Sequence, residues 1–202
     1  QLNAFSLPVS CKRLLDIRHI SELKDVDRQI LVANQNLILG DGSNTLFVSD
    51  FDGVVLHPML KGIEIRETTT SFDVKVAAGE NWHHLVEYCL KQGIKGLENL
   101  ALIPGSVGAA PVQNIGAYGA ELSDYCIAVE WFCFDTGEIE RIGSEDCEFG
   151  YRESCFKHSL KNKGIITSVL FSFPKNWQAN ISYAGLAELG KQISANEIFY
   201  EV

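Results

Sequence analysis

The sequence predicts an α+β protein of two lobes, with an α/β lobe at residues 1–57 and a strand-rich α+β lobe at residues 58–202. Three observations lead to this fold class. Short apolar runs typical of buried strands recur along the chain, many of them bounded by Gly or Asp. One helix is strongly amphipathic and needs a sheet to cover its apolar face. The length of 202 residues is enough to bury a core.

The first lobe is expected to contain one helix and two strands. A helical repeat of apolar residues begins behind Ser21, a residue type that caps helices, and predicts a helix that runs to about Ala33. Apolar runs at residues 37–39 and 54–56 predict two buried strands, and the Gly-rich segment between them predicts a turn.

The second lobe is expected to be rich in strands. Residues 57–80 are expected to form strands, and polar and apolar side chains alternate at 73–77. The clearest helix follows, with Asn81 as its N-cap and Gly93 as its stop signal. Ser194 and Glu197 form a capping box that predicts a short helix at the end of the sequence. Further strands are predicted at residues 127–134, 138–142 and 165–173.

The charge balance is acidic. The chain has 17 basic and 26 acidic residues, a net charge of −9 and a pI near 5.0, without a run of Lys or Arg that could follow a phosphate backbone. We therefore expect no nucleic-acid partner. An anionic ligand would have to be held by backbone N–H groups and one or two placed cations. No apolar run reaches the ~18 residues of a membrane span, so a cytoplasmic protein without a membrane partner is expected.

The cysteines and histidines predict no metal site. The six cysteines include no C-x-x-C pair and no spacing with histidine that suits a metal, so reduced, buried thiols are expected. His83 and His84 are adjacent on the predicted helix and lie off its apolar stripe. Adjacent helical positions do not face one metal ion, so we expect both rings to be exposed to solvent.

A stretch of 17 residues, Pro104–Ala120, contains four Gly, four Ala, two Pro and one Ser, and so has few side chains to pack. Such a segment lets backbone N–H and C=O groups approach a flat polar ligand. A run of turns that closes a β-rich domain would need the same composition. Composition alone leaves both interpretations open.

The segment Gly40–Asn44 lies between two predicted strands, so it is neither a P-loop nor the fingerprint G-x-G-x-x-G that opens a helix. Its N–H groups could form an anion-binding nest, and a hairpin turn is the alternative. Two Gly-rich loops in two lobes, with the amides of Gln113 and Asn114, suit a long ligand with a pyrophosphate and a heterocycle. A dinucleotide has this shape. Tyr118 could stack on its ring or pack in the core.

One arginine stands among aromatic residues at positions 149–157. Arg152 could hold a substrate carboxylate through two hydrogen bonds or stabilise developing negative charge. An ion pair with Glu153 or another acidic residue is the alternative that the residues alone favour. Glu80 and Glu98, each close to a glycine, are weaker candidates for ligand contact.

Five segments, taken in order, resemble the UDP-N-acetylenolpyruvoylglucosamine reductase (MurB) family: residues 40–44, 78–82, 96–108, 111–119 and 149–152. The resemblance runs over nearly the whole chain, and its long central motif is highly specific. It implies an FAD-binding fold of the vanillyl-alcohol-oxidase (PCMH) type and a bacterial flavoprotein of peptidoglycan precursor synthesis. Such an enzyme uses NADPH to reduce FAD and then reduces the UDP-sugar substrate UDP-N-acetylglucosamine enolpyruvate to UDP-N-acetylmuramate.

The resemblance also implies roles for site residues. The loop 40–44 would lie on the FAD pyrophosphate, and the loop 104–119 would line the flavin and adenosine. Arg152 would be the catalytic arginine that stabilises charge developing toward the substrate carboxylate. Tyr151 and Tyr183 would contact the nucleotide sugar. The residues expected to bind the cofactor are Gly40, Asp41, Gly42, Ser43, Asn44, Pro104, Gly105, Ser106, Gly108, Ala109, Gln113, Asn114, Gly116, Ala117, Tyr118 and Gly119.

The sequence departs from the family pattern at its C-terminal side. The segments that carry the family's serine acid, its C-terminal glutamate and its substrate-binding third domain would lie beyond Val202, in a longer chain or a partner chain. Because a positioned acid contributes ~10²- to 10⁴-fold, we expect these residues to bind FAD but to turn over poorly or not at all. Two alternatives stay open: a flavin oxidase of small alcohols with the same fold, and a catalytically silent nucleotide-binding scaffold.

Overall fold

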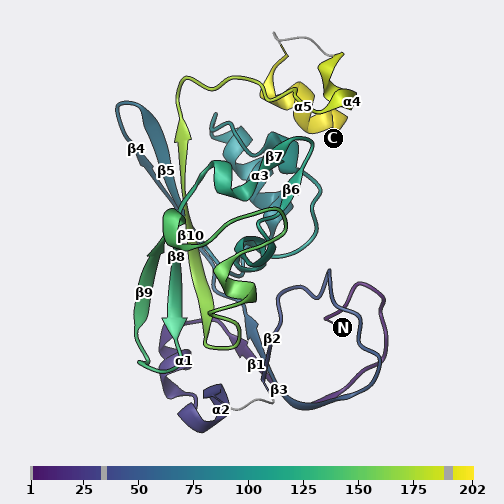
Figure 1. The fold of residues 1–202 in the computed structure, drawn as a ribbon, viewed down its shortest axis with the longest axis vertical. Coiled ribbons are helices and arrows are strands. Elements are labelled where there is room, and N and C mark those ends of the chain that lie inside the picture. Colours follow the sequence, from purple (N-terminus) through teal and green to yellow (C-terminus); the bar gives the residue numbers. More distant parts are fainter. Residues whose placement is uncertain (1, 33–35, 189–192) are drawn as a thin grey trace.

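The computed structural model describes residues 2–32, 36–188 and 193–202 (Figure 1). The first lobe contains a parallel three-stranded sheet in the order β1-β3-β2. Its elements are β1 (Cys11–Ile17), α1 (Ile20–Asp25), α2 (Arg28–Val32), β2 (Asn36–Ile38) and β3 (Phe51–Pro58).

The second lobe contains an antiparallel five-stranded sheet in the order β4-β5-β10-β8-β9, with one face covered by α3 (Trp82–Lys91). Its strands are β4 (Ile63–Glu67), β5 (Ser71–Ala77), β8 (Cys126–Cys133), β9 (Ile139–Gly143) and β10 (Gly164–Pro174).

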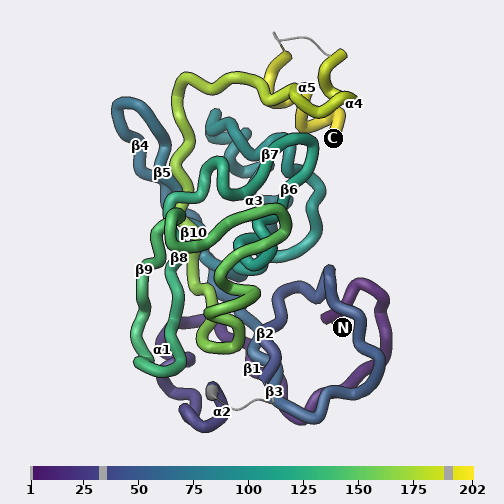
Figure 2. Tube along the Cα trace, in the orientation of Figure 1, coloured from purple at the N-terminus to yellow at the C-terminus, as the bar shows by residue number. Residues whose placement is uncertain are grey.

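Short elements complete the second lobe. The segments after α3 are η1 (Glu98–Leu100), η2 (Val107–Gln113), the ribbon of β6 (Gly116–Ala117) and β7 (Ala120–Glu121), and η3 (Leu122–Asp124). Later come η4 (Ser144–Asp146), η5 (Cys155–Lys157), α4 (Ala184–Ala187) and α5 (Ala195–Glu201). The tube in Figure 2 shows α4 and α5 beside the β6–β7 ribbon, at the end of the molecule far from the first lobe.

The α+β fold class is confirmed, and so are the strands predicted at residues 37–39, 54–56 and 73–77, which are β2, β3 and β5. The strands predicted between residues 127 and 173 are β8, β9 and β10, and the helices capped by Asn81 and Ser194 are α3 and α5. The two sheets separate after Pro58, next to the predicted lobe boundary. The division into two lobes as domains stays a prediction.

The single helix predicted from Ser21 to about Ala33 is wrong. Two short helices form instead, because Val26 is extended (φ −70°, ψ 131°) and ends α1. The side chain of Asp27 accepts a hydrogen bond from the Gln29 N–H at 2.8 Å and so starts α2 with a new cap. Ser21 is not the cap of α1, which begins after His19. Ala33 lies outside the described residues.

The first sheet also differs from the expected arrangement. β1 was not predicted, and β2 pairs with β3 in parallel. A tight hairpin joins antiparallel strands only, so the hairpin interpretation of residues 40–44 is wrong. The loop instead begins a longer connection between two parallel strands.

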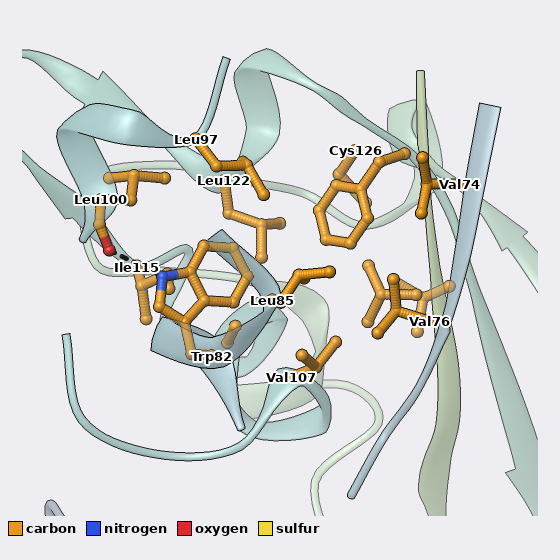
Figure 3. Packing of buried hydrophobic residues seen from close by; sticks show 14 of the residues in the cluster. Val74, Val76, Trp82, Leu85, Leu97, Leu100, Val107, Ile115, Leu122 and Cys126 are labelled. Atoms are coloured by element: carbon orange, nitrogen blue, oxygen red, sulfur yellow. Dashed lines mark hydrogen bonds between the residues drawn. The ribbon is translucent and has the colours of Figure 1, made fainter. Parts of the chain in front are cut away.

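Two clusters of buried apolar side chains form the core, one within the second lobe and one between the first lobe and the large sheet. In the second lobe, Trp82 lies among Leu85, Leu100 and Leu122, and its Nε1–H donates to the Leu100 carbonyl at 2.8 Å (Figure 3). A second cluster joins buried residues of the first lobe to the large sheet; its members include Ile17, Leu56, Leu60, Phe132, Phe134 and Ile165. This second cluster fixes where the loop after β2 meets the second lobe. No helix in the described ranges is long and apolar enough to cross a membrane.

Candidate functional site

The two Gly-rich loops predicted from the sequence lie against each other. The Ser43 hydroxyl donates to the Pro104 carbonyl at 3.2 Å, and the Asn44 side-chain amide donates to the Gln113 amide oxygen at 3.4 Å. These contacts bridge the first lobe and the second across more than sixty residues of sequence. The two Gly-rich loops, far apart in the sequence, are therefore in direct contact.

Glycine is required where the loops approach most closely. A Cβ at Gly40 would lie 2.7 Å from the Ser106 hydroxyl oxygen, and one at Gly105 would lie 3.0 Å from the Ser43 hydroxyl oxygen. Gly105 also has φ +122°, a conformation that L side chains rarely adopt. Side chains here would push the loops apart.

Two cavities adjoin at this contact. The loop cavity has a volume of about 370 Å³, and the predicted residues that line it are Ser43, Asn44, Pro104, Gly105, Ser106, Ala109, Gln113 and Arg152. The interlobe cavity has a volume of about 320 Å³ and is lined by Gly40, Ser106, Gly108 and Ala109 among the predicted residues. Ser106 and Ala109 border both cavities. A long ligand could occupy both.

Sequence reasoning missed the far wall of the interlobe cavity. Trp131 of β8 and Ile166 of β10, which are paired across the sheet, line it together with Phe156, Lys157 and Lys161. In the sequence, Trp131 and Ile166 look like core residues of strands, so the only available signal was the pair of lysines close to the Arg152 segment.

Main-chain hydrogen bonds fix the 104–108 loop to the start of α3. The Trp82 N–H donates to the Gly105 carbonyl at 2.9 Å, and the Val107 N–H donates to the Glu80 carbonyl at 2.8 Å. The Gly108 N–H donates to the Ala78 carbonyl at 2.8 Å. The cavity wall is therefore part of the folded core, which is the arrangement that preorganises a binding site.

Arg152 stands at the tip of a tight turn closed by two hydrogen bonds between Gly150 and Glu153, each 3.1 Å. Its φ of +57° is a value that turns normally assign to glycine. One guanidinium nitrogen donates to the Gly116 carbonyl at 2.8 Å, and the Lys157 ammonium donates to the Arg152 carbonyl at 2.7 Å. The turn thus directs the guanidinium to the loop cavity.

The ion pair expected between Arg152 and Glu153 is wrong. Glu153 contacts the Lys157 ammonium at 3.2 Å and also the His158 ring. These two partners hold the pKa of the Glu153 carboxyl below its usual value. Within the described ranges Arg152 has no carboxylate partner, so its charge is available to a ligand.

Strained backbone gathers around the loops. Seven non-glycine residues in the described part of the chain have positive φ, and four of them are Leu102, Asn114, Tyr118 and Arg152. Such conformations cost roughly 1–3 kcal/mol each and persist where the surrounding structure imposes them, often at functional sites. The clustering supports a binding role for this region.

Asn114 has a structural role. It is buried, its amide nitrogen donates to Glu121 at 2.8 Å and to the Gly150 carbonyl at 3.1 Å, and its oxygen accepts from the Ser123 N–H. Both amide hydrogens of the side chain are thus used within the protein, and its contact with a cofactor stays a prediction. The side chain joins the Gly-rich loop to the turn that carries Arg152.

Tyr118 does not line either cavity. Its ring packs edge-on against Tyr183 at a centroid distance of 5.3 Å, and its hydroxyl donates to the Val202 carbonyl at 3.2 Å. Of its two interpretations, packing is therefore the one that the structure supports. Tyr183 is half exposed, as a contact for a large ligand requires, and Tyr151 is more than four-fifths exposed beside Arg152.

The other expected cofactor residues are not among those that line the two cavities. Gly42 is buried, and a Cβ there would clash with the Leu2 carbonyl, while Asp41 is exposed. Gly116 contributes the carbonyl that binds Arg152, and Ala117 pairs with Ala120. Gly119 faces Ser182. Their cofactor contacts stay predictions.

The remaining candidates are structural. The Glu80 carboxylate accepts from the Gly62 N–H at 2.8 Å. No disulfide forms among the cysteines, and burial raises the pKa of Cys89 and Cys126 to about 12 and that of Cys155 to about 11. No cluster of metal-ligating side chains occurs among the described residues. His84 is exposed as predicted, but His83 is not, because its ring stacks on Phe199.

Glu98 is a buried carboxylate that accepts from the Trp177 indole N–H and the Gly96 N–H, each at 2.6 Å. Burial raises its pKa above the ordinary value of 4.5, although these two donors act in the opposite direction. The folded chain therefore holds the proton more tightly than the unfolded chain. The stabilising contribution of Glu98 is complete below pH 4.5 and is lost as the pH rises through the raised folded-state pKa.

We expect Glu98→Gln to remove this pH dependence, because glutamine does not ionise. The difference between the unfolding free energies of wild type and Glu98→Gln should decrease as the pH rises from 4 to 7. Urea denaturation at four pH values measures it. A constant difference would show that Glu98 has the same pKa in both states.

Comparisons with known proteins agree with this geometry. The family of FAD binding domains matches residues 15–143. UDP-N-acetylenolpyruvoylglucosamine reductases from Shewanella oneidensis and Pasteurella multocida are 44% and 45% identical to the chain; each alignment covers 99% of this chain and 59% of the relative. The chain thus spans about three fifths of the length of these relatives.

Solved structures give the same result. The crystal structure of UDP-N-acetylenolpyruvylglucosamine reductase from Thermus caldophilus aligns with a TM-score of 0.62 and 25% identity, over 93% of this chain and 59% of that chain. A solvent-stable cholesterol oxidase aligns with a TM-score of 0.57 and 12% identity, over 82% of this chain and 35% of that chain, and shares the fold alone. The chain therefore belongs to the family of FAD-binding domains, and its resemblance to the UDP-N-acetylenolpyruvoylglucosamine reductases is confirmed.

Proposed function

We propose that the chain binds FAD across the loop cavity and the interlobe cavity, as the FAD-holding part of a UDP-N-acetylenolpyruvoylglucosamine reductase. The observation that carries this proposal is the meeting of two Gly-rich loops from different sheets, through the Ser43–Pro104 and Asn44–Gln113 contacts. The shared border at Ser106 and Ala109 leaves one path for an elongated dinucleotide. No single cavity of this size would accommodate both ends of FAD.

The residues present fit this cofactor. Ser43, Asn44 and Gln113 provide polar groups for a pyrophosphate, and the wall with Trp131, Phe156 and Ile166 provides an apolar surface for a ring. The net charge of −9 opposes an anionic ligand, so local cations are needed. Lys157 and Lys161 border the interlobe cavity and supply such cations, while Arg152, at the loop cavity, is left for the substrate.

FAD, when bound, supplies hydride transfer, and NADPH is the proposed source of electrons. Arg152 would bind the carboxylate of UDP-N-acetylglucosamine enolpyruvate and stabilise the negative charge that develops there during reduction to UDP-N-acetylmuramate. Its guanidinium stays charged over the whole physiological pH range. Tyr151 and Tyr183, both exposed beside this region, would contact the nucleotide sugar.

An absorption spectrum of the purified chain, after reconstitution with FAD and anaerobic addition of NADPH, tests the proposal. We expect a bound two-banded flavin spectrum that bleaches with NADPH. A chain that stays colourless after reconstitution contradicts FAD binding. Rapid reaction of the reduced flavin with oxygen, without the enolpyruvyl UDP-sugar, would instead indicate an oxidase.

The variant Gly40→Val places a side chain where a Cβ would already lie 2.7 Å from Ser106, at the border of the two cavities. The valine side chain would enter the border of the two cavities or displace Ser106, so we expect FAD affinity to fall by about 10- to 100-fold, which corresponds to about 1.4–2.8 kcal/mol of binding free energy. Gly185→Val is the matched control, because a Cβ at exposed Gly185 has no neighbour closer than 3.4 Å. Fluorescence titration with FAD compares the two; equal affinities would contradict the assignment.

A further inference from the structure

His83 accepts a hydrogen bond from the cavity loop. The Leu102 N–H donates to the His83 Nδ1 at 3.1 Å. Leu102 has φ +59°, a strained conformation for a residue with a Cβ, and its side chain is mostly exposed. The loop therefore does not hold this conformation by packing of the Leu102 side chain, and the hydrogen bond to His83 supports it.

Two consecutive side chains of α3 form hydrogen bonds with the backbone of residues 100–102. The Trp82 indole N–H donates to the Leu100 carbonyl at 2.8 Å, and His83 accepts from Leu102. The next residues along the chain, Ile103, Pro104 and Gly105, line the loop cavity. A change at the His83 contact is thus one residue away from the cavity wall.

The hydrogen bond requires a neutral imidazole. A backbone N–H can only donate, so Nδ1 must carry a lone pair and the proton must reside on Nε2. The imidazolium has an N–H at both ring nitrogens and cannot accept. Protonation of His83 would therefore remove the partner of the Leu102 N–H.

One carboxylate faces the His83 ring from its own helix. On α3, the Glu87 carboxylate lies 4.0 Å from the His83 Nε2, and the exposed ring of His84 lies at a centroid distance of 6.4 Å. From α5, Phe199 stacks on the His83 ring at a centroid distance of 5.5 Å. That helix carries two carboxylates, Glu201 and Glu197, and the Glu197 carboxylate accepts a hydrogen bond from Ser194. Next to Leu100 lies Glu98, held by Trp177 and Gly96. The Glu87 carboxylate and the Leu102 N–H therefore lie next to different nitrogens of the His83 ring.

We propose that His83 is a positioning residue of the cavity, which holds residues 102–105 in place only in its neutral form, so that affinity for FAD falls when His83 is protonated. The ligand named here rests on the proposed function, whereas the response of the loop does not. Histidines generally titrate between pH 5 and 8, so this is the range to examine.

Two variants separate the hydrogen bond that His83 accepts from Leu102 from the stacking of its ring on Phe199. His83→Asn keeps an acceptor oxygen near the position of Nδ1 but cannot become charged. His83→Phe keeps a ring that can stack on Phe199 but has no acceptor. His84→Asn is the matched control, because it removes a neighbouring imidazole that is exposed.

The first readout needs no ligand. Amide hydrogen exchange of the FAD-free chain, corrected for the intrinsic effect of pH, gives the protection of the Leu102 amide. We expect protection in wild type and His84→Asn to fall by about tenfold from pH 8 to pH 5, the effect of one hydrogen bond. It should stay constant in His83→Asn and stay low in His83→Phe. Equal pH profiles for wild type and His83→Asn would overturn the proposal, even if His83→Phe failed to fold.

The second readout is the dissociation constant of FAD over the same pH range. We expect it to rise by about tenfold more in wild type than in His83→Asn between pH 8 and pH 5. Absence of FAD binding at every pH would contradict the proposed function and leave the amide result as the test of His83. A loop that responds to pH without a change in FAD affinity would overturn the positioning role.

Discussion

Under the proposed function, replacing Arg152 with glycine is expected to lower the residual turnover of the enolpyruvyl UDP-sugar by about 10²- to 10³-fold, the usual effect of removing one group that stabilises transition-state charge. The free energy of unfolding should stay within about 1 kcal/mol of wild type. A non-glycine residue in the left-handed region costs roughly 1–2 kcal/mol, which glycine would recover at φ +57°. This gain offsets the lost hydrogen bond to the Gly116 carbonyl.

Two further variants divide the effect of Arg152 into charge and geometry. Arg152→Lys keeps the charge but lacks the planar pair of donors that matches a carboxylate, so an intermediate loss is expected. Arg152→Asn tolerates positive φ and carries no charge, so it should behave as glycine does. Binding of the enolpyruvyl UDP-sugar to the FAD-loaded chain is measured beside turnover, so the result does not depend on a high rate. If Arg152→Gly lost FAD in proportion to activity, the arginine would hold the cofactor or the fold and not the substrate.

The strained backbone of Arg152 and the partners of Glu153 could not be predicted from the sequence. The residues around it indicated an ion pair with Glu153, because adjacent opposite charges usually suggest one. In the structure the turn from Gly150 to Glu153 points the two side chains to different partners, and Glu153 binds Lys157 and His158. Only the turn geometry excludes an ion pair between Arg152 and Glu153.

Elements with strong local signals were predicted well. The helix α3 has a capping asparagine, an unbroken apolar stripe and a glycine stop, and each feature has its expected role in the structure. The helix expected behind Ser21 had periodicity alone, and the local cap at Asp27 divided it. Periodicity without matching end signals does not specify one continuous helix.

The sequence predicted which distant segments meet but not which residues connect them. The two Gly-rich loops were expected to serve one ligand, and Ser43 and Pro104 do meet. However, the role of Asn114 in joining the loop to Gly150, and that of His83 in holding Leu102, depend on how α3 and the Arg152 turn pack. A single sequence contains no signal for such partners, since both residues also suit exposed or ligand-binding positions.

Replacing Trp82 with alanine is expected to destabilise the chain by about 3–5 kcal/mol, the largest stability effect of any single change considered. The side chain is almost fully buried, packs edge-on against Phe171 at a centroid distance of 6.2 Å and satisfies the Leu100 carbonyl. For a chain of this length the loss corresponds to a fall in Tm of about 6–20 °C. Tyr88→Ala, on the exposed side of the same helix, is the matched control and should change stability by less than about 1 kcal/mol.

Trp82→Phe separates packing from hydrogen bonding. Phenylalanine keeps most of the apolar contact and leaves the Leu100 carbonyl without its donor, which should cost about 1–3 kcal/mol. Urea denaturation of the three variants measures these differences. Trp82 also borders the loop cavity, so bound FAD should stabilise wild type more than Trp82→Ala. Trp82→Phe could instead lose as much stability as Trp82→Ala. In that case the hydrogen bond from Trp82 to the Leu100 carbonyl would contribute more to stability than the apolar packing of the ring.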